Sequence, residues 1–374
     1  MKFTIDAKTF SSALSRVQTI TGQRSSMPIL ANVLLCASSL RPVLHISATD
    51  LEVGYETAID CDVDDPGSIT VPAKKLYEVV KASPSSSVLV ELDLKNSRVT
   101  ISAGTYIVAL QGLDASDFPQ VPVEPGEGLQ LDAAALLQLI GHVDYAQSTD
   151  EQKYNLCGTF FKVQSCDDDW RLYAVATDGH RLAADSIPLS GDVRSIPASL
   201  AKGLIVSRKG IAELKKLSRK GILCLDISGN HLTVATETDK LTMRLVDGDF
   251  PDYQKIYPTT TGSVEVKRTP LRDSLERVSL FSPDKQRGVS LYFSEGEISF
   301  SAQHAEYGDA TDRLAAGVEC APCTRRFSSG YLDQALSVWD SNFVEIKLGD
   351  ELAPVLITPL GMQEPYAVIM PMRL

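Results

Sequence analysis

The sequence predicts an α+β fold made of three tandem copies of one unit, in which two helices pack on the inner face of antiparallel sheets. Three observations predict this fold. A short alternating strand that runs directly into a helix recurs at residues 3–14, 129–140 and 264–275. A second strand, turn and helix recurs at residues 69–80, 204–214 and 326–336. The segments between them alternate apolar and polar residues, as half-buried strands do.

Two short motifs also repeat and help to place the ends of the units. Ala-Thr-Asp occurs at residues 48–50 and again at 176–178. Asp-Phe-Pro occurs at residues 117–119 and 249–251, where each of the first two units ends. We therefore expect domains at residues 1–125, 126–256 and 257–374, of which the third copy is the most divergent.

Length and composition fit a protein of this kind. A chain of 374 residues holds two or three ordinary domains. Hydrophobic residues make up 44% and charged residues 22%, the balance of a soluble globular protein. No apolar run approaches the roughly 18 residues that a membrane helix needs. The start of the chain has Asp6 where a signal peptide would have its apolar core. We expect a cytoplasmic protein that does not engage a membrane.

The seven cysteines are an odd number and lie mostly among apolar residues, which indicates reduced thiols rather than a disulfide scaffold. Cys36, Cys157 and Cys224 fall in strand-like runs. Cys320 and Cys323 form one CxxC pair, and a zinc site would need two further ligands at suitable spacing. The sequence therefore predicts no metal and no cofactor.

The net charge of −12 argues at first against a nucleic-acid partner, since phosphate contacts supply most non-specific affinity for DNA. The repeated helices are nevertheless amphipathic, with lysine and arginine on their polar faces. Their expected apolar faces are Phe10, Leu14 and Val17; Leu76, Val79 and Val80; Ile211, Leu214 and Leu217; and Leu271, Leu275 and Val278. Their expected basic faces are Lys8 and Arg16; Lys74, Lys75 and Lys81; Arg208, Lys209, Lys215, Lys216, Arg219 and Lys220; and Arg268, Arg272 and Arg277.

Two interpretations of these basic faces are open. For any single helix, lysine and arginine simply keep one face solvated. If the helices of successive units line one surface, however, their basic faces merge into a positive stripe. The acidic surplus then lies on strands and loops such as residues 60–65, 124–127 and 167–169. That segregation is what an acidic protein needs in order to track along DNA.

An enzyme is the rival class, and the motifs that would support it are missing from the sequence. Asp178 and His180 could belong to a nucleophilic triad, but the chain has no GxSxG segment. It also lacks the GxxxxGK[ST], HExxH and GxGxxG patterns. We expect no catalytic residues. A scaffold built from repeats that never encloses DNA is a third alternative, and it does not explain the shared basic helix faces.

Seven motifs, spread from one end of the chain to the other, resemble the bacterial DNA polymerase III beta subunit family. They lie at residues 27–32, 49–52, 71–75, 177–183, 244–253, 287–289 and 370–374. The resemblance implies the DNA-clamp fold, with a head-to-tail homodimer that closes six domains into a ring around duplex DNA. Such a ring acts as a sliding clamp, a processivity factor that tethers polymerases to DNA.

The resemblance also implies partners and site residues. The partners are duplex DNA without sequence preference, the DNA polymerase III alpha subunit and other polymerases, a clamp loader, and other proteins with a clamp-binding motif. The DNA contacts would be Arg24, Lys74, Lys153, Tyr154, Arg208 and Lys209. The peptide pocket would comprise Leu156, Thr177, Gly179, His180, Arg181, Leu182, Pro251, Lys255, Ile256, Val368, Met370, Pro371, Met372 and Arg373. The dimer contact would join Leu280 and Phe281 to Val108 and Leu110.

Each of these assignments has a plainer alternative. The four dimer residues could belong to an ordinary core. Met370 and Met372 could sit on a strand that packs inward, and His180 could be a hydrogen-bonded structural histidine. The chain also departs from the family pattern at Asp150 and Asn155, where we expect a neutral amide and a second tyrosine. These two residues put part of the loop contact with DNA in doubt.

Overall fold

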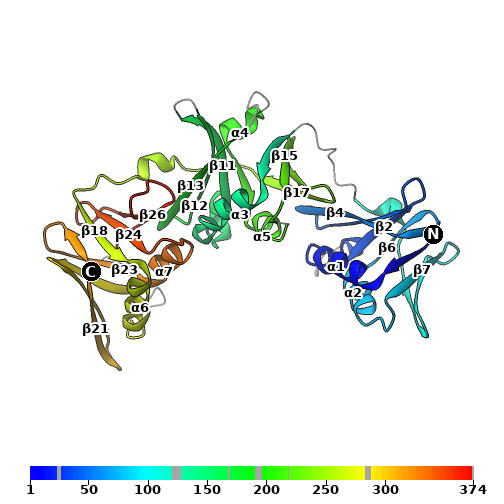
Figure 1. The fold of residues 1–374 in the computed structure, drawn as a ribbon, viewed down its shortest axis with the longest axis horizontal. Helices are drawn as coiled ribbons and strands as arrows, with labels where there is room; N and C mark the ends of the chain where they lie inside the picture. The colour runs from blue at the N-terminus through cyan, green and yellow to red at the C-terminus, as the bar shows by residue number, and fades with distance from the viewer. Residues whose placement is uncertain are drawn as a thin grey trace. The chain divides into compact units, whose positions relative to one another are not determined.

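The computed structural model describes residues 1–22, 27–119, 128–166, 169–189, 196–217, 219–282 and 288–372. The chain folds into two compact units (Figure 1). The first unit comprises Met1–Ala133 and Ala212–Leu245, and the second comprises Ala134–Ile211 and Val246–Leu374. The second repeat copy therefore contributes to both units, and the domain limits expected from the sequence stay a prediction.

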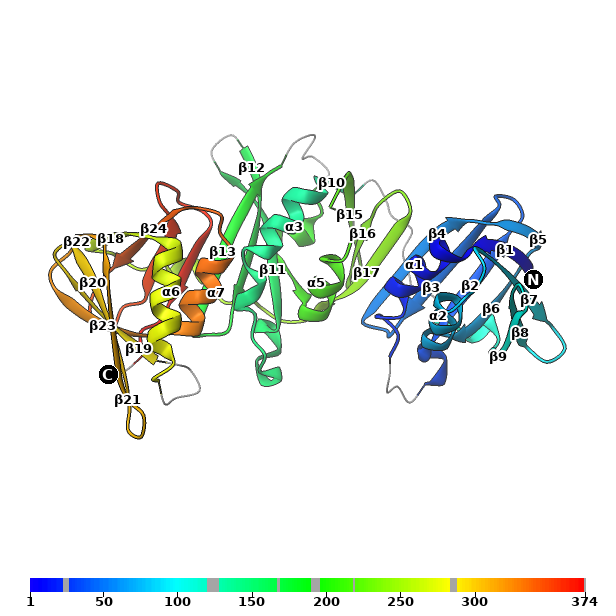
Figure 2. The same cartoon turned by 60° about the horizontal axis from the view of Figure 1, so that its bottom comes forward.

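All six strand–helix segments that the repeats predict are present. Figure 2 labels their helices, α1, α2, α3, α5, α6 and α7. The first set comprises β1 (Lys2–Asp6) with α1 (Ala7–Val17), β10 (Leu129–Asp132) with α3 (Ala133–Gly141), and β18 (Gly262–Lys267) with α6 (Arg268–Ser279). The second set comprises β6 (Gly67–Pro72) with α2 (Ala73–Lys81), β14 (Leu204–Ser207) with α5 (Arg208–Leu214), and β23 (Cys323–Ser328) with α7 (Ser329–Ser337). A short helix that the repeats do not predict, α4 (Ala198–Lys202), precedes β14.

The first unit contains two antiparallel sheets. One has the order β5 (Asp62–Asp65), β1, β7 (Ser87–Asp93), β8 (Arg98–Ala103) and β9 (Tyr106–Gln111). The other follows the pairings β6, β2 (Asn32–Ser38), β3 (Val43–Thr49), β4 (Val53–Asp60), β17 (Asp239–Val246), β16 (His231–Ala235), β15 (Ile222–Ser228) and β10. Because β4 pairs with β17, one sheet joins strands of the first and second repeat copies.

The second unit repeats this arrangement one copy further along the chain. Its larger sheet follows the pairings β14, β11 (Gly158–Cys166), β12 (Asp169–Thr177), β13 (Arg181–Pro188), β26 (Tyr366–Ile369), β25 (Val355–Pro359), β24 (Phe343–Leu348), β18 and β22 (Gly317–Glu319). Its smaller sheet has the order β21 (Gly308–Ala315), β20 (Glu297–His304), β19 (Gly288–Ser294) and β23. The β13–β26 pairing joins the second and third copies.

The helices bury nearly all of the apolar faces predicted for them. Phe10, Leu14 and Val17 of α1 are buried, and Phe10 contacts Phe3 edge to face at a ring distance of 6.3 Å. The prediction is wrong for Val79, which is half-buried. In α2 the buried residues are Ala73, Leu76 and Val80, so Val79 lies at the margin of the apolar stripe.

The charged helix after Val206 is shorter than the sequence suggests. α5 ends at Leu214, and the chain continues in a turn, so Lys215 and Lys216 do not lie on a helix. The amide of Leu217 donates to the carbonyl of Leu214 at 3.1 Å, which tightens the last turn. Leu217 is therefore buried as predicted, although it reaches the core from a turn.

Short 3₁₀ helices complete the fold. They are η1 (Pro28–Ala31), η2 (Ala115–Asp117), η3 (Asp144–Ala146), η4 (Glu151–Leu156) and η6 (Tyr253–Ile256). Across the described ranges, no helix has the length and apolar character required to cross a membrane. Cys36 and Cys224 lie in strands as expected, but Cys157 caps η4 immediately before β11.

Candidate peptide pocket and DNA-contact residues

The repeated Thr-Asp motif forms the same turn twice, between β3 and β4 and between β12 and β13. In the second turn, the amide of Gly179 donates to Thr177 Oγ1 at 3.1 Å, and the amide of His180 donates to Asp178 Oδ1 at 2.8 Å. The hydroxyl of Thr177 donates to the carbonyl of Arg181 at 2.6 Å. Gly179 has a φ of 91°, in the left-handed region that glycine tolerates best.

The first turn has the same hydrogen bonds from different residues. The amide of Leu51 donates to Thr49 Oγ1 at 3.0 Å, and the amide of Glu52 donates to Asp50 Oδ1 at 3.1 Å. Leu51 takes the place of Gly179 with a φ of 76°, which is uncommon for a residue with a side chain. The pseudo-repeat therefore extends to single hydrogen bonds.

Each turn also receives a hydrogen bond from the strand of the next repeat copy. The amide of Met370 donates to the carbonyl of His180 at 3.0 Å, next to the β13–β26 pairing. In the first unit, the amide of Arg244 donates to the carbonyl of Glu52 at 2.8 Å. The two junctions thus share one backbone geometry. The side chains at the two junctions differ, because Met370 in the second unit occupies the place of Arg244 in the first unit.

Arg181 is buried beneath the second turn, with 9% of its surface exposed. Its Nε donates to Asp178 Oδ2 at 3.2 Å, one Nη donates to the carbonyl of Tyr145 at 2.6 Å, and the other donates to Gln334 Oε1. The guanidinium also stacks between the rings of Tyr145 and Tyr331. Burial raises the pKa of both phenols, so the cation faces neutral rings.

A separate apolar cluster supports the junction between β13 and β26. It contains Leu182 and Val368, which face each other across the strand pair. Phe250 and Tyr253 pack against this cluster, and the Phe250 ring stacks on Phe160 at 4.8 Å. These contacts bring the segment that contains Pro251, Lys255 and Ile256 to the same region, and all three of these residues are exposed.

The structure therefore brings most of the predicted pocket residues together within the second unit. Among these residues, Thr177, Leu182 and Val368 are buried, Met370 has 42% of its surface exposed, and Pro371 and Met372 are half-buried. Lys153 donates to the carbonyl of Asp178 at 3.2 Å, which places η4 and its last residue, Leu156, beside the turn. Arg373 lies outside the described residues.

Leu352 is an exposed apolar residue of the second unit that the motifs did not single out. It precedes β25 and has 75% of its surface exposed. Val355 pairs with Ile369 at the end of the β25–β26 ladder, and beyond it Met372 forms a bridge to Arg326 of β23.

Four of the predicted DNA contacts lie close together in the second unit. The amide of Arg208, at the start of α5, donates to the carbonyl of Cys157 at 3.0 Å, which ties α5 to the end of η4. Arg208 is exposed, and so are Lys153 and Tyr154 in η4. The clustered residues are Lys153, Tyr154, Arg208 and Lys209. In the first unit, Lys74 is exposed at the start of α2, and Arg24 lies outside the described residues.

The two departures from the family pattern have structural roles. Asp150 is the N-cap of η4, and its carboxylate accepts the amide of Gln152 at 3.1 Å. The side-chain amide of Asn155 donates to the carbonyl of Asp249 at 2.9 Å. An N-cap carboxylate is partly neutralised by the helix end that it caps, so Asp150 repels a phosphate less than a free acid would.

The arginines of α6 are less available than a basic face requires. Arg268 is half-buried and donates to the carbonyls of Ser341 at 2.7 Å and Leu336 at 2.9 Å. Arg272 pairs with Asp333 at 2.8 Å, and Arg277 pairs with Asp312 at 2.5 Å. Arg277 is exposed, as expected, although it is ion-paired, whereas Arg268 and Arg272 are only half-exposed.

The predicted dimer residues are at least partly exposed to solvent, apart from their contacts within the fold. Val108 and Leu110 are half-buried on β9, the last strand in its sheet order, where the neighbouring Ile107 is 64% exposed. Leu280 follows α6 and is 72% exposed. Phe281 packs partly against the core of the third repeat copy, so its side chain also has a role within the fold.

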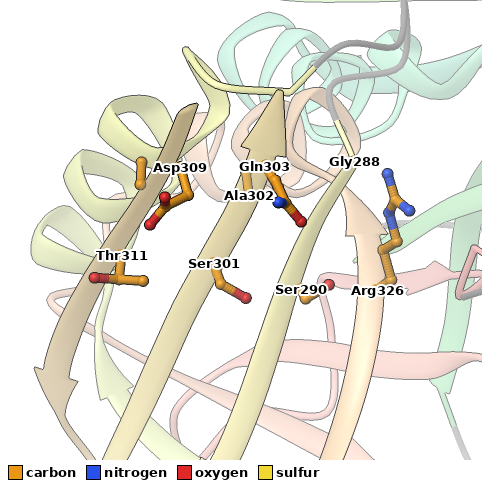
Figure 3. Close-up of a pocket in the computed structure, with 9 residues that line it drawn as sticks. Gly288, Ser290, Ser301, Ala302, Gln303, Asp309, Thr311 and Arg326 are labelled. Atoms are coloured by element: carbon orange, nitrogen blue, oxygen red, sulfur yellow. The ribbon is translucent and has the colours of Figure 1, made fainter. Parts of the chain in front are cut away.

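A polar hollow of about 560 Å³ lies on the sheet of β21, β20, β19 and β23. Figure 3 shows Thr311, Ser301 and Ser290 on three neighbouring strands, in register with one another. Hydroxyl groups of this kind do not suit a hydrophobic peptide. Among the residues that the structure describes, no cluster of three or more histidine, cysteine or acidic side chains is placed to hold a metal ion.

Comparison with known proteins agrees with this geometry along the whole chain. Residues 1–122, 130–252 and 254–373 match the N-terminal, central and C-terminal domains of the DNA polymerase III beta subunit. The beta sliding clamp of Pseudomonas putida is 31% identical, over 100% of both chains.

Two solved structures are similar over 100% of both chains. A beta sliding clamp from Caulobacter crescentus gives a TM-score of 0.93 at 30% identity. A sliding clamp from Bartonella birtlesii, bound to griselimycin, gives a TM-score of 0.93 at 32% identity.

The fold and these matches define a three-domain DNA clamp with α+β content. Within that class, the chain belongs to the DNA polymerase III beta subunit family. It is a DNA sliding clamp, a processivity factor whose partners are DNA and a polymerase.

Proposed function

We propose that two copies of the chain associate head to tail into a closed ring of six domains, and that the ring holds polymerases on duplex DNA by enclosing it. The family membership of the whole chain is the observation that carries this proposal. Phosphate contacts carry no base information, so a ring lined with lysine and arginine holds DNA of any sequence and still slides. Enclosure supplies persistence, because release then requires the ring to open.

The dimer contact in this proposal joins sheet edges. β9 and β21 are each last in the order of their sheet, so within the described residues each has a strand neighbour on one side. Such edges accept a strand from another chain. The exposed side chains of Ile107 and Leu280 supply apolar area beside them. A heterologous contact of this kind closes into a ring when its rotation returns to the start.

The peptide pocket lies, in this proposal, at the β13–β26 junction. The rim residue Met370 and the base formed by Leu182 and Val368 offer an adaptable apolar surface. The griselimycin bound to the Bartonella birtlesii clamp supports a pocket of this kind. The partners would be the DNA polymerase III alpha subunit, other polymerases, the clamp loader and further proteins with a clamp-binding motif. In this proposal the chain has no catalytic role of its own and acts in the cytoplasm, as membership of a family of processivity factors supports.

The test is to load the protein onto a nicked circular plasmid with a clamp loader and then linearise the plasmid. A ring that holds DNA by enclosure slides off the free ends, so linearisation releases it. Blocking both ends with bound proteins should restore retention. Retention on linear DNA with free ends would show binding by contact alone, and a protein that never loads onto the circle would support a scaffold without DNA.

A further inference from the structure

The Cys-Ala-Pro-Cys segment of the third repeat copy crosses from one sheet of the second unit to the other. Cys320 follows β22, which pairs with β18 in the larger sheet. Cys323 is the first residue of β23, which pairs with β19 in the smaller sheet (Figure 2). Only Ala321 and Pro322 lie between the two cysteines. The fold therefore positions the two thiols from different sheets, in addition to their closeness in sequence.

Strand contacts fix the backbone at both cysteines. A Cβ atom added at Gly262 of β18 would lie 2.4 Å from the Cβ of Cys320, so the Cys320 side chain lies directly against this glycine. Cys323 pairs with Phe293 of β19. Both cysteines also pack partly against the hydrophobic core of the third copy. Because each residue is held in this way, little chain entropy remains to be lost when the two thiols react with each other.

The two thiols are in contact and can be reached from solvent. Burial raises the pKa of the Cys320 thiol, and so do the charge of Cys323 and a hydrogen bond between the two side chains. Both cysteines are free thiols and half-buried, while Ala321 and Pro322 in the turn are exposed. Within the described ranges, the pair does not belong to a group of three or more metal-ligating side chains. Two thiols of this kind suit a disulfide better than a structural zinc ion.

We propose that Cys320 and Cys323 form a redox site, in which a low-molecular-weight disulfide such as oxidised glutathione reversibly converts the two thiols into an intramolecular disulfide. Disulfides in a reducing compartment are usually transient and redox-sensing rather than structural. The product adds a covalent link between β22 and β23, and therefore between two sheets that share one core. This site does not depend on the proposed ring.

The reaction consists of two thiol–disulfide exchanges. The thiolate of Cys323 attacks one sulfur of oxidised glutathione, so that a mixed disulfide forms and one glutathione thiolate leaves. The thiolate of Cys320 then attacks the Cys323 sulfur, the mixed disulfide breaks, and the second glutathione leaves. The protein loses two electrons and two protons, and the oxidant gains them as two thiols. Cys323 attacks first because the raised pKa of Cys320 keeps that thiol protonated.

Mass spectrometry of the full-length protein in glutathione buffers tests the proposal. Free thiols are blocked with N-ethylmaleimide in denaturant after an acid quench, and the protein is then digested with trypsin. Cleavage after Arg313 and Arg325 places both cysteines in one peptide, residues 314–325, which has no other cysteine. As the ratio of oxidised to reduced glutathione rises, this peptide should lose both alkylation sites and two hydrogen atoms.

The same digest contains a matched control. Residues 25–74 form another tryptic peptide with two cysteines, Cys36 and Cys61, because Arg41 precedes Pro42 and is not cleaved. These cysteines are not adjacent in the sequence, and their peptide should keep both alkylation sites under the same buffers. Equal loss of alkylation in the two peptides would show unspecific oxidation and overturn the proposal.

A synthetic peptide of residues 314–325 separates the contribution of the fold from that of the sequence. At equal glutathione ratios, the disulfide in the protein should be favoured at least about tenfold over the disulfide in the peptide, because β22 and β23 hold the thiols together. Equal formation in protein and peptide would overturn the proposal. Cys320→Ser should accumulate the mixed disulfide with glutathione at Cys323, since the second exchange is then blocked. A Cys320→Ser protein that stays fully reduced would contradict the first step.

Discussion

The guanidinium of Arg181 lies 4.4 Å from the centroid of the Tyr331 ring, and this contact joins the turn after β12 to helix α7. Arg181 comes from the second repeat copy and Tyr331 from the third. The same guanidinium donates to the carbonyl of Tyr145, which follows α3. One buried cation therefore fixes the base of the proposed pocket to both copies that form it.

Replacing Arg181 by Ala should destabilise the protein strongly. The change removes the guanidinium donor from Asp178 Oδ2 and from the carbonyl of Tyr145 and opens a cavity beside two rings, which together cost about 2–4 kcal/mol. Urea denaturation of the full-length protein measures this loss. His180→Ala is the control, since His180 is adjacent and exposed and should change stability by less than about 0.5 kcal/mol. Equal stability of the two variants would show that the hydrogen bonds of Arg181 do not stabilise the folded protein.

Removing residues 370–374 should abolish binding of a polymerase-derived peptide, because the truncation deletes the apolar rim that Met370 supplies. The dimer should persist, since β26 ends at Ile369 and its pairing with β13 is retained. Fluorescence anisotropy with a labelled peptide measures the first outcome, and sedimentation measures the second. A truncated dimer with unchanged peptide affinity would remove the C-terminal segment from the pocket.

Replacing Leu280 by Lys should give folded monomers, because the substitution places a charge on an exposed apolar residue at the proposed dimer contact. Leu280 is a better choice than Phe281, whose ring packs partly on the core. Light scattering after size-exclusion chromatography measures the mass. Leu40→Lys is the control, at a residue with 98% of its surface exposed in the turn after β2, and it should stay dimeric. Dimers of the Leu280 variant would place the interface elsewhere.

Replacing Arg277 by Gln should raise the pKa of Asp312. The hydrogen bond and charge of Arg277 hold this pKa below its ordinary value in the folded protein. The pair thus contributes stability above the unfolded pKa, and that contribution is lost as the pH falls through the folded pKa. Carboxyl-carbon NMR titration measures the shift. Arg313→Gln, at the residue that follows Asp312, should raise the Asp312 pKa less than Arg277→Gln does. Equal shifts in the two variants would contradict the assignment of the lowered pKa to Arg277.

The sequence predicts the strand–helix pairs well because their signal is local. In α1, the spacing of Phe10, Leu14 and Val17 defines the buried face without knowledge of the rest of the fold. The repetition of each pattern adds independent support, since the same elements must form in every copy. Helix ends are less predictable: the run after Val206 continues the apolar spacing to Leu217, yet α5 ends at Leu214.

The side-chain networks could not be predicted, because their members are distant in the sequence. Arg181 and Gln334 are 153 positions apart, and Arg272 and Asp333 are 61 apart. Lysines and arginines on a polar helix face look alike in sequence whether a carboxylate from another element pairs with them or not. The pairing of Arg272 with Asp333 and of Arg277 with Asp312 becomes visible only when the fold brings these partners together.

Electron-microscope images of the purified full-length protein test the central claim of enclosure most directly. The account predicts a dimeric particle with a central opening wide enough for duplex DNA, and added duplex should appear threaded through it. A compact particle without an opening, or duplex bound along the outer edge, would contradict the account.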